Sequence, residues 1–117
     1  MRNEKNFGPK DEVVEAIREE IREEIADLEE YAKQGKQPPQ CRGYRFKVNG
    51  DAYVVHDPII TGKEVLTIAE LTPPEYYTLR VKIAGQRPQK VELDEEVNLR
   101  TPGIEKFKAL PRDQTEG

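Results

Sequence analysis

Apolar and polar residues alternate strictly over residues 44–48, and this period of two predicts a half-buried β-strand. The dipeptide Asn49-Gly50 follows directly and is a strong signal for the tight turn of a β-hairpin. A second strand is expected after the turn, with Tyr53 and Val55 on one face. The hairpin therefore opens a β-rich module.

A helix is expected to interrupt the strands of this module. Thr61, followed three residues later by Glu64, has the spacing of a capping box, and apolar residues recur at helical spacing after it. Further strands are predicted over residues 76–83, 90–93 and 104–110. The order strand, strand, helix, strand, strand, strand predicts an α+β domain in which one helix packs across a mixed sheet, the β-grasp layout.

The first third of the chain has a helical pattern instead. Residues 11–34 predict one long acidic amphipathic helix, with Asp11 as a candidate N-cap and Gly35 as its C-terminal stop. Its apolar stripe, a candidate partner-binding face, consists of Val14, Ile17, Ile21, Ile25 and Leu28. Such a helix is marginal in isolation, so the stripe is expected to pack on the module, on another copy or on a partner enzyme.

Two prolines, Pro38 and Pro39, mark the clearest boundary, because they end helical structure and favour an extended spacer. The predicted organisation follows from this boundary. It is a flexible lead at 1–10, the acidic helix at 11–34, a proline-containing linker at 35–42, the β-grasp domain at 43–110 and a flexible C-terminal tail at 111–117.

Charge is distributed unevenly along the chain, whose net charge is −4. Residues 1–40 hold 11 Asp/Glu and 7 Lys/Arg, whereas residues 41–117 hold 12 of each. Because no basic stripe stands out, nucleic acid is not expected as a partner. No apolar run is long enough for a membrane span and no signal peptide is recognised, so with a single cysteine the expected location is cytoplasmic.

Few residues suggest catalysis or metal binding. Cys41 and His56 are the only residues of their kinds and lack the three or four convergent ligands that a metal site needs, so no metal is expected. Cys41 is interpreted as a linker thiol, and the acidic clusters as solvated surface. The chain is therefore not expected to be an enzyme or to carry a cofactor.

The tail ends in Gly117, which has no Cβ and would present a carboxylate at the end of a mobile arm. Such an arm is suited to enter the active site of another protein. Gly117 is therefore the candidate donor for conjugation. The candidate contacts to an activating enzyme are Leu110, Pro111, Arg112, Asp113, Gln114, Thr115 and Glu116.

The stretches "DPIITG" at 57–62 and "TPGIEKFKALP" at 101–111, together with the hairpin, resemble the bacterial multiubiquitin type of ubiquitin-like domain. The resemblance covers roughly residues 43–117. It implies a modifier from bacterial conjugation operons, some of them linked to antiphage defence. The implied partners are an E1-like activating enzyme that uses ATP, an E2-like carrier, a zinc-dependent JAB-type deconjugating protease and target proteins. The family's functional residue is the C-terminal glycine, which here falls on Gly117.

This chain departs from the family pattern at three points. Many members carry tandem copies, and this chain has one. Glu116 stands where ubiquitin has the first glycine of its terminal pair, and Lys82 occupies the exposed position that ubiquitin receptors read. A dedicated activating enzyme is therefore implied, and ordinary ubiquitin-binding domains are not expected to recognise the chain.

Two other functions stay open. One is a β-grasp sulfur carrier that holds sulfur as a C-terminal thiocarboxylate. The other is a ubiquitin-like module that binds a partner without covalent chemistry. A fold alone does not choose between these functions.

Overall fold

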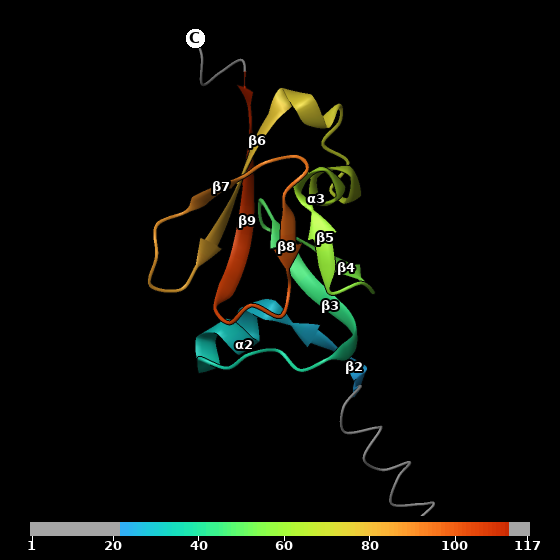
Figure 1. The fold of residues 1–117 in the computed structure, drawn as a ribbon, viewed down its shortest axis with the longest axis vertical. Coiled ribbons are helices and arrows are strands. Elements are labelled where there is room, and N and C mark those ends of the chain that lie inside the picture. Colours follow the sequence, from blue (N-terminus) through green and yellow to red (C-terminus); the bar gives the residue numbers. More distant parts are fainter. Residues whose placement is uncertain (1–21, 113–117) are drawn as a thin grey trace, which may run out of the picture.

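The computed structural model describes residues 22–112 and folds them around one mixed sheet (Figure 1). In chain order the elements are β2 (Arg22–Asp27), α2 (Leu28–Gln34), β3 (Cys41–Val48), β4 (Asp51–Val55), β5 (Ile59–Thr61), α3 (Gly62–Ile68), the short 3-10 helix η1 (Pro74–Tyr76), β6 (Tyr77–Ile83), β7 (Gln89–Val91), β8 (Glu96–Asn98) and β9 (Ile104–Pro111).

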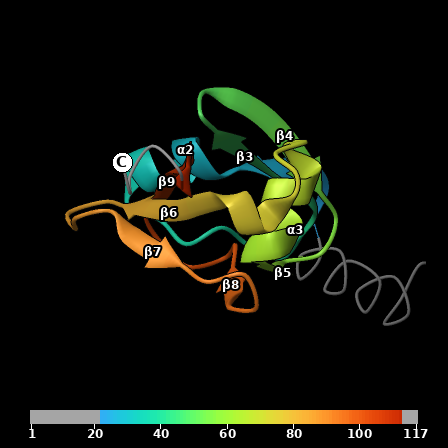
Figure 2. The ribbon, with the colours of Figure 1, turned by 90° about the horizontal axis from the view of Figure 1, so that it is seen from above.

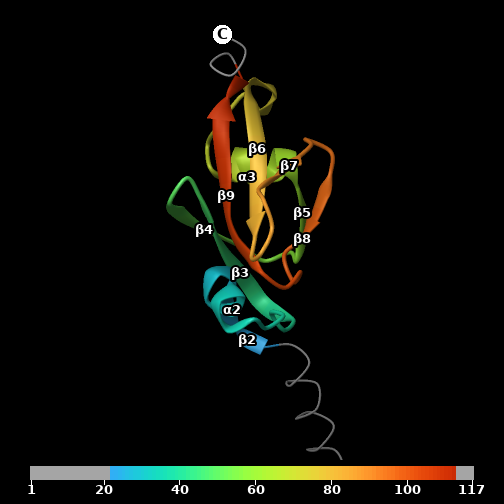
Figure 3. The ribbon, with the colours of Figure 1, turned by 90° about the vertical axis from the view of Figure 1, so that its left-hand side faces the viewer.

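The main sheet has the order β2-β3-β9-β6-β7, with β4 paired to β3. Its central strand, β9, runs parallel to β3 and antiparallel to β6. A separate two-stranded sheet joins β5 and β8. The predicted α+β order is confirmed by β3, β4, α3, β6, β7 and β9, and α3 lies behind the β6–β9 pair in Figure 3.

The core lies between the main sheet and α3. From Tyr44 of β3 onward, and along β6 and β9, buried side chains alternate with more exposed ones, and Val65 and Leu66 of α3 are buried in the same core. Phe46 of β3 and Phe107 of β9 meet edge to face, with ring centroids 5.5 Å apart. The main-sheet residues of the buried cluster are Ala26, Cys41, Tyr44, Phe46, Val48, Leu79, Val81, Val91, Ile104, Phe107 and Ala109.

The hairpin turn does more than reverse the chain. Asn49 and Gly50 both have positive φ, 53° and 92°, as the predicted two-residue turn requires. The side chain of Asn49 then reaches the central strand: its Oδ1 accepts from the Ala109 N–H at 2.9 Å, and its Nδ2 donates to the Ala109 carbonyl at 3.1 Å. The Asn49 N–H also donates to the Phe107 carbonyl at 3.1 Å. Asn49 therefore extends the β3–β9 pairing beyond the last residue of β3.

The "DPIITG" stretch builds the start of α3. Asp57 accepts from the Ile59 N–H, and Thr61 and Glu64 form the predicted capping box, with bonds of 2.8 and 3.2 Å. A Cβ on Gly62 would collide with the Glu92 carbonyl, so only glycine lets the helix approach this loop. The motif thus fixes where α3 begins and what it packs against.

The N-terminal segment departs from the prediction. The expected helix over 11–34 is wrong for residues 22–27, which form β2, and only residues 28–34 are helical. The lead at 1–10 and residues 11–21, with Val14, Ile17 and Ile21, lie outside the described residues. The remaining two stripe residues do not share one helical face, because Ile25 lies in β2 and is 37% exposed, whereas Leu28 begins α2 and is 2% exposed.

The register of β3 explains why a helical pattern becomes a strand. Tyr44 and Arg45 pair with β4 on one edge and with β2 on the other, and Val48 pairs with both β4 and β9. β2 and β9 therefore share the same edge of β3, with β2 beside its first half and β9 beside its end. Backbone groups along that first half would otherwise lack partners, and β2 satisfies them. Asp27 then accepts from the Glu29 N–H and starts α2.

The predicted linker at 35–42 is also corrected. Pro38 is fully buried, and its carbonyl accepts from Arg100 Nε at 3.1 Å. Cys41, interpreted as a linker thiol, is the buried first residue of β3. Only Gly35 behaves as expected, since it ends α2 in the left-handed conformation with φ 68°. Residues 22–42 are thus part of the folded body, which begins before residue 43.

If the N-terminal segment is integral to the core, Leu28→Ala should lower the free energy of unfolding by about 2–4 kcal/mol, because it leaves a cavity beneath α2. Leu110→Ala is the matched control: Leu110 is 45% exposed, so its loss should cost less than about 1 kcal/mol. Urea denaturation of the full chain measures both. Equal midpoints for the two variants would contradict the docked segment.

The role of Asn49 can be tested with two substitutions. Asn49→Gly keeps the turn but removes both side-chain bonds, and it should cost about 1–3 kcal/mol of stability. Asn49→Asp keeps the acceptor and loses the donor, so its cost should be intermediate. Hydrogen exchange at the Ala109 N–H should accelerate most in Asn49→Gly. Unchanged protection at that amide would show that the bond does not hold β9.

Candidate functional site

The end of β9 is the point where the described chain leaves the body. β9 stays paired with β6 to its last residue, where Pro111 lies opposite Tyr77. Arg112 Nε then donates to the Tyr77 carbonyl at 3.2 Å. This end of the sheet lies at the pole opposite β2 and α2 (Figure 1). β2 and α2 therefore lie away from the exit of the chain.

The predicted tail residues divide into two groups. Leu110 is exposed, but Pro111 belongs to β9 and both Pro111 and Arg112 are half-buried, so the mobile tail predicted from residue 111 begins too early. The other candidate residues, including the donor, lie outside the described residues and keep their roles as predictions: Asp113, Gln114, Thr115, Glu116 and Gly117.

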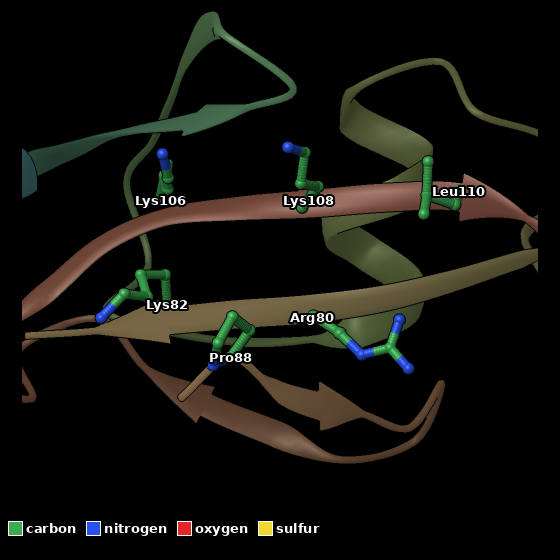
Figure 4. A pocket seen from close by; sticks show the side chains of 6 residues that line it. All are labelled: Arg80, Lys82, Pro88, Lys106, Lys108 and Leu110. Atoms are coloured by element: carbon green, nitrogen blue, oxygen red, sulfur yellow. The ribbon is translucent and has the colours of Figure 1, made fainter. Parts of the chain in front are cut away.

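A basic face covers the side of the β6–β9 pair that points away from α3. The same alternation that buries Leu79, Val81, Phe107 and Ala109 sends the intervening side chains outward. In register, Arg80 lies opposite Lys108 and Lys82 lies opposite Lys106. With Pro88 and Leu110, these four cations line a shallow hollow of about 340 Å³ (Figure 4). We call these six residues the basic face.

The four cations of the basic face lie close to one another, and Lys106 also lies near enough to Glu29 to lower the pKa of that carboxyl. Lys82 Nζ donates to the carbonyls of Gln86 and Ile83, at 2.6 and 3.1 Å. Within residues 22–112, no carboxylate forms an ion pair with Arg80, Lys82, Lys106 or Lys108. Two like-charged pairs therefore stand directly opposite each other on neighbouring strands, an arrangement that is unfavourable by itself.

Among residues 22–112, acidic groups do contact other cations on this side of the sheet, at its margins: Asp27 lies 3.8 Å from Arg45 of β3, and Glu92 lies 3.7 Å from Lys90 of β7. Lys47 of β3 lies on the outward side, and its Nζ is 2.9 Å from Glu29 Oε1 of α2. α2 therefore lies on the side of the sheet opposite α3, as Figure 2 shows from above. The hydrogen bond and charge of Lys47 lower the pKa of Glu29 below its usual value, and the same contact raises the pKa of Lys47.

The sequence expectation of no basic stripe is wrong for the folded chain. The signal was present, because "LRVKI" and "EKFKAL" alternate apolar and basic residues. The sequence alone does not show that these two runs form neighbouring strands, with their basic residues directly opposite each other. Charge counting missed the basic face because residues 41–117 contain 12 acidic and 12 basic residues, which cancel in the sum.

The lone cysteine and histidine do not form a site. Cys41 is buried, and its backbone N–H donates to the Tyr44 hydroxyl at 2.9 Å. His56 is exposed, with Nδ1 3.1 Å from the Arg42 carbonyl. Among residues 22–112, no three His, Cys, Asp or Glu side chains converge as a metal site would require. None of the helices in this part of the chain has the length and apolar character to cross a membrane.

Comparison with known protein families gives one match. The model of the Multiubiquitin family, a family of ubiquitin-like domains, matches residues 44–112, which is more than half of the chain. The match runs from the strand before the hairpin to the residue that follows β9. Searches of curated proteins and of solved structures find no match. The predicted ubiquitin-like β-grasp fold is supported by this match together with the sheet.

The pair between Glu29 and Lys47 predicts a specific pH dependence of stability. The folded-state pKa of Glu29 is lowered from 4.5, so its contribution is complete above that pH and is lost as the pH falls through the lowered value. The folded-state pKa of Lys47 is raised from 10.5, so its contribution is present below that pH and is lost as the pH rises through the raised value.

A double-mutant cycle with Glu29→Gln and Lys47→Met should therefore show coupling at neutral pH that disappears in strong acid and at about 1 M salt. Urea denaturation at each condition provides the measurement. A coupling free energy that is unaffected by both acid and salt would mean that packing, not charge, joins α2 to the sheet.

Proposed function

We propose that this chain, which belongs to the multiubiquitin family of ubiquitin-like domains, is a protein modifier whose donor is the carboxylate of Gly117. The carboxylate is exposed either directly or by cleavage after that residue. Partner enzymes activate it and join it to amines of target proteins. Bacterial conjugation and a part in antiphage defence are the context that the family resemblance suggests, and a cytoplasmic setting is the expectation drawn from the single cysteine.

The observation that carries this proposal is the position of the chain exit. β9 is the central strand, held by β3 on one side and by β6 on the other. Tyr77 anchors both Pro111 and Arg112 at its end. Residues 113–117 therefore follow from a fixed point at an uncovered pole of the body. An enzyme can hold the folded domain there while it takes up the carboxylate.

The chemistry has three steps, and all nucleophiles come from other proteins. The Gly117 carboxylate attacks ATP to give an acyl adenylate and pyrophosphate. A cysteine thiolate of the E1-like activating enzyme displaces AMP to form a thioester, and a cysteine thiolate of an E2-like carrier then attacks that thioester and displaces the first thiolate. A target amine then displaces the thiolate and forms an amide, which a zinc-dependent JAB-type protease would hydrolyse. Glycine suits these steps because it lacks a Cβ that would crowd the acyl carbon.

This chain contributes a held body and an accessible acyl donor. Leu110 is exposed next to the exit and can contact the activating enzyme. Arg112 is tied to Tyr77, so we assign it first to positioning the exit and only then to enzyme contact. Asp113, Gln114, Thr115 and Glu116 would lie along the channel of the enzyme. Neither a metal nor a cofactor of its own is needed for this role.

A ubiquitin-like module that binds without conjugation is the second candidate. The basic face favours it, because four cations that form no ion pair within residues 22–112 suit a charged partner. The sulfur carrier has no such structural support. The two alternatives predict different outcomes. A binding module should form no covalent product, whereas a sulfur carrier should yield a protein in which sulfur replaces one oxygen of the terminal carboxylate.

The test uses the cognate activating enzyme, ATP and either the intact chain or a variant that lacks Gly117. The intact chain should form a thioester that thiols cleave, followed by adducts that resist them, and the deletion variant should form neither. Gln37→Ala, at an exposed position after α2, is a control with the C-terminus unchanged. Equal adduct formation with and without Gly117 would refute the donor role, and intact mass would reveal a thiocarboxylate.

A further inference from the structure

The basic face has the geometry of a recognition surface. Arg80 and Lys82 come from one strand and Lys108 and Lys106 from the next, so four cations form two cross-strand pairs (Figure 4). Residues two apart on a strand are separated by about 7 Å, and opposite residues by about 5 Å. Such a grid matches a run of carboxylates on a single peptide segment.

The charges on this face are costly without a ligand. Like charges directly opposite on neighbouring strands destabilise a sheet. Within residues 22–112 no carboxylate forms an ion pair with any of the four cations, and only the more distant charge of Glu29 acts on Lys106. Lys82 is turned instead toward two backbone carbonyls. An external ligand that carries negative charge would remove this repulsion.

We propose that the basic face binds an acidic segment of a partner protein, with an aliphatic side chain of that segment seated between Pro88 and Leu110. This goes beyond the modifier role and does not involve Gly117. The lining is mixed, since Pro88 and Leu110 provide apolar surface beside the four cations, and Leu110 is 45% exposed. Such a lining fits a peptide that combines carboxylates with an aliphatic residue better than a phosphate backbone.

The structure already contains a contact of this kind, between a carboxylate and a cation on the outward side of the sheet. Glu29 of α2 contacts Lys47 on the outward side of the same sheet. The nearby charges of Lys33 and Lys106 also help to lower the pKa of Glu29. An acidic helical segment thus already lies against the margin of the cationic surface, and the four cations beyond it are uncovered. The net charge of −4 for the chain further disfavours a long polyanion such as a nucleic acid.

The chain's own acidic segment, residues 11–21, is poorly placed to be the ligand. It joins β2 at Arg22, which pairs with Cys41, whereas Val48, at the other end of β3, pairs with Phe107. That length of β3 spans about 23 Å. A helix over residues 11–21 would reach only about 16 Å. The part of the predicted helix that precedes β2 is therefore too short, as a helix, to cover the basic face of the same molecule.

The test measures binding of short fluorescent peptides to the full chain at low salt. The probe alternates glutamate and alanine around one central leucine, and a second peptide has glutamine in place of every glutamate. Lys106→Glu should weaken binding of the acidic probe by at least about fivefold. Lys63→Glu is the matched control, because the same charge change falls on exposed α3, on the other side of the sheet, and should change affinity by about twofold at most.

Support requires that the acidic probe binds, that salt weakens it and that the amide resonances it shifts lie in β6 and β9. The proposal is overturned if the glutamine peptide binds equally, if Lys63→Glu is as damaging as Lys106→Glu, or if the acidic probe does not bind at all. Stronger binding of an oligothymidylate of equal length would assign the surface to nucleic acid and equally overturn it.

One further variant tests the chain's own segment as occupant. Substitution of Glu15, Glu19 and Glu20 by glutamine in the full chain should leave the free-state resonances of β6 and β9 unchanged. If they shift, and affinity for the probe rises, residues 11–21 occupy the surface and the partner assignment fails. A variant that lacks Gly117 should bind the probe normally, so failure of conjugation and failure of this surface are distinguishable.

Discussion

The structure depends on the way in which the hairpin holds the last strand. β9 is central in the sheet, yet its register with β3 contains one residue pair, Val48 with Phe107. Asn49 adds three hydrogen bonds to β9, one from its backbone and two from its side chain. A turn residue thus acts as an extension of a strand. Because β9 joins the hairpin half of the sheet to β6 and β7, these bonds connect the first and last parts of the domain.

The register of β9 that these hydrogen bonds help to fix determines both faces of the sheet. Residues on a strand alternate sides, so a slip of one residue in β9 would send Phe107 and Ala109 outward and Lys106 and Lys108 into the core. Burying two ammonium groups without partners is prohibitive. The apolar core and the basic face are therefore two consequences of one register, and neither can change without the other.

The N-terminal segment, residues 22–42, provides the strand that pairs with the part of β3 that β9 does not reach. β9 reaches β3 only at its end, so the first half of that edge of β3 is free for another strand. β2 occupies it, α2 follows with Leu28 in the core, and Glu29 joins Lys47 on the outward side. This addition lies at one pole, and the end of β9 lies at the other. The body is thereby enlarged without covering either the basic face or the exit of the chain.

The sequence by itself determined the elements whose causes are local. The Asn49-Gly50 turn, the capping box of Thr61 and Glu64, and the alternation along β3 and β6 depend on neighbouring residues, and each is found where the pattern put it. Tertiary structure decided what depends on partners distant in the chain. A helical pattern became β2 because an open edge of β3 required hydrogen bonds, Pro38 was buried by packing near Arg100, and the basic face arose from two runs placed in register. The spacing of residues in a segment indicates which secondary structures that segment can form. The neighbouring strand, which can come from a distant part of the chain, decides which surface the side chains of the segment build.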